Sequence, residues 1–215
     1  MIELLIKGVV SYLLGSIVGS LLIGHLHGID IRTTGSGNAG ATNAMRSLGK
    51  RAALTVLIID IAKGWVATGF LAPWAVPPLL AASAELSAWC KPVCALAVML
   101  GHVYPLWYGF RGGKGVATLL GVVLGINAWL ILPMILVWLV TVSLSGFVSL
   151  GSILATVALA IAIAARHPTP PLVTFGILAV LFVTFTHRAN IARMRAGTES
   201  RARRLWLFGP RRGQA

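Results

Sequence analysis

The chain has 215 residues, of which 57% are hydrophobic and only 11% are charged, with a mean hydropathy of +0.88. This composition is far too apolar for a water-soluble domain of this length. Its 18 Lys and Arg residues outnumber 5 Asp and Glu residues, which gives a net charge of +13. A basic excess can serve nucleic acid, membrane topology or an anionic ligand. We expect no nucleic-acid partner, because so apolar a chain leaves no soluble domain to bind one.

Long uncharged stretches define the fold class. Residues 8–29, 64–84, 92–110, 115–165 and 167–187 contain no Asp, Glu, Lys or Arg. A helix that crosses a hydrocarbon core of about 30 Å needs about 20 apolar residues. The sequence therefore predicts an all-α polytopic integral membrane protein, embedded in the lipid bilayer.

The distribution of basic residues predicts the topology, because Lys and Arg near helix ends favour the cytoplasm. Segment 29–51 and the region from His187 onward, with eight of the thirteen arginines, are both basic. The six apolar runs lie at about 8–27, 52–72, 79–107, 116–142, 147–165 and 171–186. Six single crossings would place the two basic segments on opposite sides, so one crossing is missing.

The run 116–142 is the natural place for the missing crossing. Gly125, Asn127 and Pro133 interrupt it and could divide it into two short helices or a re-entrant pair. We therefore expect about seven transmembrane helices, with the N-terminus outside and the C-terminus cytoplasmic. Residues 1–199 would form a single transmembrane domain, and residues 200–215 a basic cytoplasmic tail that binds anionic lipid.

This topology brings four polar segments to the cytoplasmic face, which suggests a single site: 29–51, 108–115, 143–152 and 187–199. The first segment contains GSGNAGATNAMRSLGK, with glycines at Gly35, Gly37 and Gly40. Its polar side chains are Ser36, Asn38, Thr42, Asn43 and Arg46. Glycines let backbone N–H groups approach an anion, although a flexible polar loop would have the same composition.

Part of this segment also matches G-x-G-x-x-G, the dinucleotide-binding pattern. The match follows a membrane helix instead of a strand, and Asp60 lies inside the next apolar run. We therefore do not expect a dinucleotide fold.

The second segment, FRGGKGVAT, surrounds Arg111 and Lys114 with Gly112, Gly113 and Gly115 just before an apolar helix. This arrangement predicts another anion cradle, although a glycine-rich turn with interfacial charges would also serve topology. It is not a Walker A loop, because Gly115 occupies the position where Mg²⁺ binding needs Ser or Thr.

The third segment, THRANIARMRAGTES, places His187 and Asn190 three residues apart, so both side chains would share a helix face. A packed interfacial histidine is the simpler alternative for His187.

Inside an apolar run, Asp60 and Lys63 have the same three-residue spacing as His187 and Asn190. Because ionisable groups are costly in a membrane, we expect these two to form an ion pair.

Together the three segments carry a family resemblance. GIDIRTTGSGNAGATNAMRSLGK, GHVYPLWYGFRGGKGVAT and HRANIARMRAGTES, in this order, closely resemble the bacterial acyl-phosphate:glycerol-3-phosphate acyltransferase (PlsY) family. The resemblance runs from Tyr12 to Glu199. It implies a multi-pass enzyme of the bacterial inner membrane with its active site near the cytoplasmic face.

The resemblance also implies the reaction, the first acylation step of phospholipid biosynthesis. A fatty acyl group would move from acyl phosphate to the 1-hydroxyl of glycerol 3-phosphate, giving lysophosphatidic acid and inorganic phosphate. It implies neither a metal nor a cofactor, and a peripheral acyl-phosphate synthase could supply the donor.

Roles follow residue by residue from the matching motifs. Catalytic roles are implied for Ser36, Arg46, His187 and Asn190. Binding of substrate and phosphate is implied for Gly37, Asn38, Thr42, Asn43, Arg111, Gly112, Gly113, Lys114, Gly115 and Ser149. Glu199 would be structural, and Ser145 and Ser152 are close alternatives to Ser149. The general base is either His187 or a substrate phosphate oxygen.

Two other classes fit parts of the sequence. Residues 25–30 match the H-x-x-x-x-D pattern of other glycerolipid acyltransferases, with His25 and Asp30 as the pair. We interpret this match as a coincidence, because the glycine/arginine block of those enzymes is missing. A phosphate-ester transporter would also use anion cradles, although the sequence shows no obvious inverted repeat.

Overall fold

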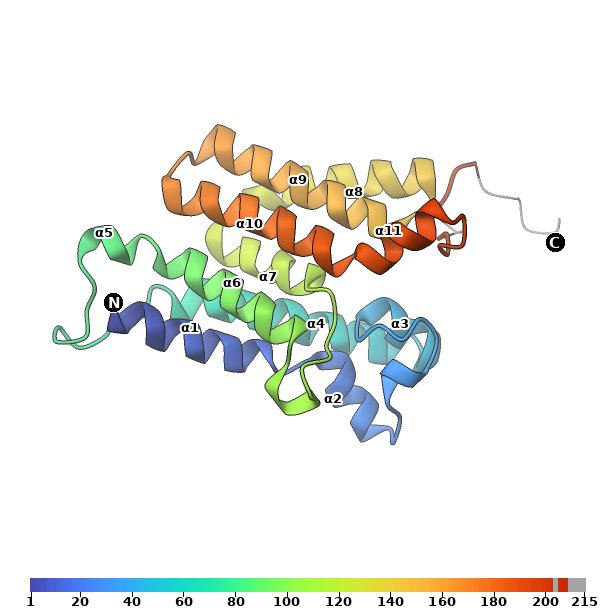
Figure 1. The fold of residues 1–215 in the computed structure, drawn as a ribbon, viewed down its shortest axis with the longest axis horizontal. Coiled ribbons are helices and arrows are strands. Elements are labelled where there is room, and N and C mark those ends of the chain that lie inside the picture. Colours follow the sequence, from blue (N-terminus) through green and yellow to red (C-terminus); the bar gives the residue numbers. More distant parts are fainter. Residues whose placement is uncertain (203–204, 209–215) are drawn as a thin grey trace. The chain divides into compact units, whose positions relative to one another are not determined.

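The fold is built from helices. The computed structural model describes residues 1–202 and 205–208, and every regular element in these ranges is helical (Figure 1). The α-helices are α1 (Ile2–Gly15), α2 (Gly19–Leu26), α3 (Ala41–Ser47), α4 (Lys50–Val66), α5 (Ala84–Ser87), α6 (Cys90–Val103), α7 (Val116–Asn127), α8 (Ile131–Ser145), α9 (Val148–Arg166), α10 (Pro170–Thr186) and α11 (Arg188–Arg195). Short 3-10 helices lie at Ile31–Thr33, Leu106–Tyr108 and Ala128–Leu130, and a π-helical turn at Ala67–Leu71. The all-α prediction is confirmed.

Several helical stretches are long and apolar enough to cross a membrane. In the described part of the chain these are Ile2–Leu26, Lys50–Leu71, Ala84–Tyr108, Val116–Ser145 and Val148–Arg166. A sixth is formed by α10 and α11, which meet at a bend of 57°. The polytopic character is therefore supported, while seven crossings and the orientation of the termini remain predictions.

The run expected to supply the extra crossing divides at the expected place. The 3-10 turn Ala128–Leu130 follows Asn127 directly and separates α7 from α8. Pro133 is the third residue of α8, where its missing N–H is tolerated because first-turn N–H groups have no partner in the helix. The two helices have 12 and 15 residues, so each is only about 18–22 Å long.

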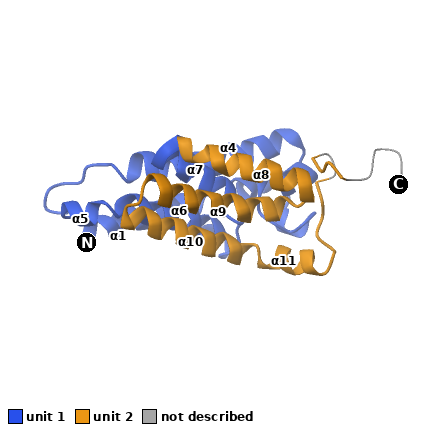
Figure 2. Ribbon diagram, turned by 90° about the horizontal axis from the view of Figure 1, so that it is seen from above, with its two compact units in different colours: residues 1–128 blue, residues 129–215 orange. Residues whose placement is uncertain are grey.

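The chain forms two compact units, which are called unit 1 (Met1–Ala128) and unit 2 (Trp129–Ala215) (Figure 2). In unit 1, α1 packs on α6, and α4 packs on α7. Small residues permit the second contact: a Cβ at Gly64 would overlap the carbonyl oxygen of Thr118, and one at Gly121 would overlap that of Ile61. Such residues let membrane helices approach closely, which rigidly joins the two loop-bearing helices.

In unit 2, α9 packs against both α8 and α10. Gly146 ends α8 in the left-handed conformation with φ of 76°, which a residue with a Cβ adopts only with strain. α10 begins with Pro170 and Pro171, whose missing N–H groups would have no helical partner there. The bend after α10 falls at His187, so this side chain is carried at a helix junction.

Candidate functional site

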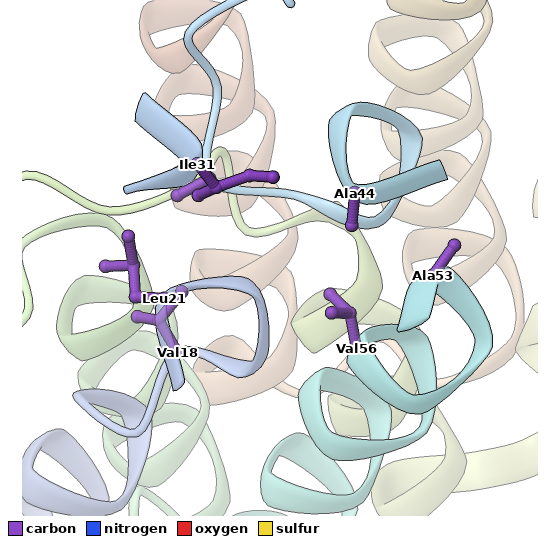
Figure 3. Close-up of a cluster of buried hydrophobic side chains, with 7 residues drawn as sticks. Val18, Leu21, Ile31, Ala44, Ala53 and Val56 are labelled. Carbon is purple, nitrogen blue, oxygen red and sulfur yellow. The ribbon is translucent and has the colours of Figure 1, made fainter. Parts of the chain in front are cut away.

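The first polar segment rests on a buried apolar cluster in unit 1 (Figure 3). The cluster consists of Val18, Leu21, Ile31, Ala39, Ala44, Ala53 and Val56. These residues come from the N-cap and first turn of α2, the loop after α2, α3 and α4, so the cluster joins the loop to two membrane helices. Removing apolar surface from water or headgroups in this way fixes the loop on its base.

Asn43 organises the backbone of this loop from a buried position. Its Nδ2 donates to the carbonyl oxygens of Ile31 (2.9 Å) and Thr34 (3.0 Å), and its Oδ1 accepts from the N–H of Ser36 (2.8 Å). Both amide protons are therefore used inside the loop. The sequence predicted that Asn43 is a supporting polar group. In the structure its side chain fixes the backbone N–H of Ser36.

The remaining polar side chains of the loop are more accessible. Ser36, Thr42 and Arg46 are exposed, and Asn38 is half-buried. Thr42 and Arg46 are four residues apart on α3 and therefore share one face. Hydroxyl and guanidinium groups on an accessible face can contact an anion without first breaking internal bonds.

The second loop, residues 109–115, uses its glycines differently from the expected anion cradle. The N–H of Gly112 donates to the carbonyl oxygen of Val103 (2.9 Å), and that of Gly113 donates to the carbonyl oxygen of His102 (3.1 Å). These carbonyls belong to the last turn of α6, where helix carbonyls lack internal partners. The two N–H groups thus cap α6 in this structure, so the glycines pack the loop against the helix end.

The two loops meet at Gly113. A Cβ there would overlap both the carbonyl oxygen of Ala39, in the first loop, and Nε2 of His102. Lys114 follows directly and is half-buried, and Gly115 adopts φ of 86° before α7 begins. A left-handed backbone conformation at this position favours glycine, which has no Cβ. The backbone thereby fixes the place from which the Lys114 side chain leaves the loop.

Arg32 also ties the two loops together, although the sequence suggested no role for it in the site. Its Nε and Nη2 donate to the two carboxylate oxygens of Asp30 (both 2.9 Å), and its Nη1 donates to the carbonyl oxygen of Tyr108 (2.9 Å). The Arg32 guanidinium holds the pKa of Asp30 below its usual range. The Asp-x-Arg spacing in IDIR was the available signal, since it allows such a local two-pronged pair.

A polar hollow of about 620 Å³ lies between these segments of unit 1. It is lined by Asp30, Arg32, Thr33, Gly37, Tyr108, Gly109, Arg111 and Gly112. Gly37, Arg111 and Gly112 were expected at a phosphate site, and the structure brings them to one hollow. Because Arg32 is paired with Asp30, Arg111 supplies the excess positive charge among the lining residues.

In unit 2, the carboxylate of Glu199 is the centre of the third motif. Its Oε1 accepts from Asn190 (2.6 Å) and Ser149 (2.9 Å), and its Oε2 accepts from Arg193 (2.7 Å). Burial raises the pKa of Glu199, but the bonds from Asn190, Arg193 and Ser149 outweigh it and leave the pKa below its usual range. Glu199 thus brings Ser149 next to Asn190, and the structural role that the resemblance implies for it stays a prediction.

The same contacts separate Ser149 from its two alternatives. Ser145 donates its hydroxyl proton to the carbonyl oxygen of Thr141 (2.6 Å), and Ser152 donates to that of Val148 (3.0 Å). Both bonds stay within the residue's own helix. Of the three serines, Ser149 is therefore the one joined to the third motif.

His187 is buried, with 3% of its surface exposed. Its Nδ1 lies 2.8 Å from the carbonyl oxygen of Val183. Because a carbonyl can only accept, the Nδ1 carries the proton, and the lone pair of the neutral ring is on Nε2. If His187 is the general base, Nε2 is therefore the atom that would take the proton.

The expected ion pair inside the membrane is confirmed. Lys63 Nζ lies 3.0 Å from Asp60 Oδ1, and both side chains are almost completely buried. His102 joins them at 2.8 Å from Lys63 Nζ, a contact that the sequence analysis did not find. His102 follows Lys63 by 39 residues, so local spacing carries no signal for it.

The alternative H-x-x-x-x-D pair lacks the arrangement that catalysis would need. His25 is exposed at the end of α2, and the carboxylate of Asp30 is paired with Arg32. A histidine and a carboxylate that work together share a hydrogen bond. The pairing of Asp30 with Arg32 supports the interpretation of this match as a coincidence.

Comparison with known proteins extends over nearly the whole chain. The family model described as glycerol-3-phosphate acyltransferase matches residues 5–197. A glycerol-3-phosphate acyltransferase of Geobacter sulfurreducens is 39% identical over 207 residues, covering 94% of this chain and 98% of the relative. One from Desulforamulus reducens is 44% identical over 190 residues, covering 88% of this chain and 90% of the relative.

Two solved structures agree with these sequence relatives. Both are crystal structures of PlsY, an integral membrane glycerol 3-phosphate acyltransferase, in its glycerol 3-phosphate and lysophosphatidic acid forms. They are 35% and 34% identical to this chain with TM-scores of 0.82 and 0.80, and each comparison covers 92% of this chain and 94% of the other. Together with the matches above, this shows that the chain belongs to the PlsY family of glycerol-3-phosphate acyltransferases, as an integral membrane acyltransferase.

Proposed function

We propose that this protein transfers a fatty acyl group from acyl phosphate to the 1-hydroxyl of glycerol 3-phosphate, producing lysophosphatidic acid and inorganic phosphate. The observation that carries the proposal is the similarity, over 92% of the chain, to PlsY in its glycerol 3-phosphate form. The polar hollow supports the proposal, because Arg111 adds positive charge to its Asp30–Arg32 pair, and Lys114 follows two residues after Gly112 of its lining.

The chemistry of an acyl phosphate limits what the protein must supply. The donor is a mixed anhydride, so its phosphate is already a good leaving group. The hydroxyl oxygen attacks the carbonyl carbon, an ester bond forms, and the carbon–oxygen bond to phosphate breaks with its electron pair leaving on phosphate. The hydroxyl proton passes to Nε2 of His187 or to a substrate phosphate oxygen. Orientation and charge neutralisation then account for most of the catalysis.

Residue roles follow from position and charge. Arg46 and Lys114 neutralise phosphate, and Ser36 donates a hydrogen bond to it. His187 and Asn190 act at the reacting hydroxyl and carbonyl. Gly37, Asn38, Thr42, Arg111, Gly115 and Ser149 line the substrates, whereas Asn43, Gly112 and Gly113 shape the loops. A covalent acyl-serine is unnecessary, because an activated donor can transfer its group directly.

The test is an assay of purified protein with palmitoyl phosphate and glycerol 3-phosphate, beside palmitoyl-CoA as the donor. We expect inorganic phosphate and lysophosphatidic acid in equal amounts, and no product from the CoA ester. Lys114→Ala should lower kcat/KM by about 10²-fold or more, because it removes a charge at the transferring group. Lys91→Ala is the control, since Lys91 lies in the first turn of α6, at the opposite end of that helix from the loop.

The other outcomes identify what is wrong. Transfer from the CoA ester alone would refute the donor assignment. Flux of glycerol 3-phosphate across sealed vesicles without any product would favour a transporter over an enzyme.

We also propose that the polar residues of both units serve one reaction. Arg46→Ala and His187→Ala would then be strongly non-additive in kcat, because residues that stabilise one transition state act as a set. Effects on kcat that multiply fully would contradict this proposal.

We place the protein in the bacterial inner membrane with seven crossings, the N-terminus outside and the reaction at the cytoplasmic face. Leu79→Cys, at a residue that is 92% exposed, should react with an impermeant maleimide added outside spheroplasts. Lys50→Cys, also exposed, should react only after permeabilisation. The cysteines at 90 and 94 are buried and provide the background. The reverse labelling pattern would invert the topology.

A further inference from the structure

Unit 1 contains a buried charged network that the reaction described above does not use. Asp60, Lys63 and His102 are 1%, 4% and 3% exposed. Lys63 Nζ lies 3.0 Å from Asp60 Oδ1 and 2.8 Å from Nδ1 of His102. Burying such groups is costly, so a network of this kind is retained only where its geometry is well satisfied.

The Asp60 and Lys63 side chains join the two halves of the first membrane helix. Lys63 Nζ donates to the carbonyl oxygens of Gly15 (2.9 Å), at the end of α1, and Ile17 (2.8 Å). Asp60 Oδ1 accepts from the N–H of Gly19 (3.1 Å), at the start of α2. A cation thus meets the negative end of one helix and an anion meets the positive end of the next. The pair thereby fixes where α2 begins, and α2 leads into the first loop.

The His102 side chain connects the same network to the second loop. The Nδ1 of His102 lies 2.8 Å from Lys63 Nζ and 3.4 Å from Asp60 Oδ1, so this nitrogen contacts both members of the ion pair. Nε2 faces Gly113, where an added Cβ would overlap it and the carbonyl oxygen of Ala39. The N–H of Gly113 also donates to the carbonyl oxygen of His102 (3.1 Å). One side chain therefore lies against both loops at the residue before Lys114.

We infer that Asp60, Lys63 and His102 are positioning residues that set the two glycine-rich loops relative to each other for glycerol 3-phosphate. The inference rests on the proposed function for the identity of that substrate. The network touches α2, the end of α6 and Gly113, so a change in it displaces both loops at once. Misplaced loops weaken binding of glycerol 3-phosphate, whereas His187 and Asn190 lie outside these loops, so KM should rise more than kcat falls.

The decisive variants change His102. His102→Leu removes both ring nitrogens at similar volume, and His102→Asn restores a polar amide near the Nδ1 position. We expect His102→Leu to raise KM for glycerol 3-phosphate about tenfold with kcat within about threefold, and His102→Asn to restore KM to within about threefold. Calorimetric binding of glycerol 3-phosphate alone should weaken in parallel. If His102→Leu does not fold, His102→Gln decides, because its amide reaches the Nε2 position but leaves no polar group at the Nδ1 position beside Lys63 and Asp60.

Unit 1 offers a matched control in its other buried ion pair. Lys7 Nζ lies 2.6 Å from Glu3 Oε1 and donates to the carbonyl oxygen of Ala72 (2.7 Å). Lys7→Met should lower thermal stability and leave KM unchanged, because this pair holds residues 72 and 82 instead of the glycine-rich loops. The inference is overturned if the His102 variants, like Lys7→Met, change only stability, or if they lower kcat without changing KM. A wild-type protein that binds glycerol 3-phosphate but releases no phosphate from acyl phosphate would refute the proposed donor and leave the binding test valid.

Discussion

The two units hold their candidate functional residues in different ways. In unit 1, the loops are fixed by many small contributions, which include the amide of Asn43, main-chain bonds to the end of α6 and the Arg32 bridge. In unit 2, one carboxylate, that of Glu199, receives bonds from Asn190, Ser149 and Arg193. The positions of these residues therefore depend on many separate contacts in unit 1 and on one carboxylate in unit 2.

This difference has a physical basis in the number of hydrogen bonds that each acceptor group can receive. A carboxylate has two oxygens with about four acceptor positions, so one side chain can organise several donors by charge-assisted bonds. Main-chain bonds such as Gly113 to His102 survive most side-chain changes. Among residues that position others without contacting substrate, single substitutions should therefore cost more activity in unit 2 than in the loops of unit 1.

Among these variants, the largest effect is expected from Glu199→Ala. It tests whether the functional residues of unit 2 depend on one carboxylate for their positions. Asn190 and Ser149 lose their common acceptor, so both side chains can turn away from their working positions. We expect kcat to fall by about 10²-fold or more, because loss of orientation by even about 1 Å is costly. The measurement is steady-state phosphate release with acyl phosphate.

Two variants serve as controls for this loss. Arg193→Ala removes only the outer donor and should lower kcat by less than about tenfold. Glu199→Gln can keep the Oε1 acceptor and should recover part of the activity lost in Glu199→Ala. Equal losses in Arg193→Ala and Glu199→Ala would show that charge, and not the organisation of Asn190 and Ser149, matters.

A smaller loss is expected when the first loop is loosened. Asn43→Ala deletes the bonds to Ile31, Thr34 and Ser36, but the apolar cluster beneath the loop remains. We expect kcat/KM for glycerol 3-phosphate to fall about 10- to 50-fold, with a loss of stability of about 1–3 kcal/mol from unsatisfied buried groups. Thr55→Ala, which removes an exposed bond on α4, should leave both quantities nearly unchanged. An Asn43→Ala loss as large as that of Glu199→Ala would remove the contrast between the units.

Arg32→Lys tests the bridge between the two loops and should have a milder effect. Lysine keeps the charge but cannot bind Asp30 with two prongs and reach the carbonyl oxygen of Tyr108 as well. We expect KM for glycerol 3-phosphate to rise about three- to tenfold with kcat nearly constant. Arg51→Lys, at an exposed residue of α4, is the matched control. Identical kinetics for Arg32→Lys and the wild type would mean that Arg32 does not set the distance between the loops.

Local sequence patterns accounted for the fold and for contacts within one segment. Apolar runs predicted the membrane helices, Asn127 marked the break after α7, and the spacing of Asp60 and Lys63 predicted their ion pair. In each case the cause lies within a few turns of one helix. Such patterns can be read without knowing how helices pack.

Contacts between distant segments could not be predicted in this way. Arg32 reaches Tyr108 across 76 residues, and Lys63 reaches His102 across 39. The glycines at 112 and 113 were expected to expose their N–H groups to an anion, but the end of α6 takes both bonds. A loop of glycines and a lysine could either bind an anion through its N–H groups or cap the end of a helix. Only the packing of the loop on α6 decides between these two uses.

The smallest effect concerns pH and isolates Glu199 from the rest of the protein. Its pKa is lower in the fold than in the unfolded chain, where a glutamate titrates near about 4.3. The carboxylate therefore stabilises the fold above that pH, and the contribution is lost as the pH falls through the lowered pKa. We expect the wild type to melt about 2–4 °C above Glu199→Gln at pH 7, and the gap to shrink below about pH 4.5. Asp30, whose pKa shifts in the same direction, is present in both proteins, so the difference reports Glu199 alone. A gap that stays constant down to pH 3 would show that the Glu199 carboxylate gains nothing from its three donors.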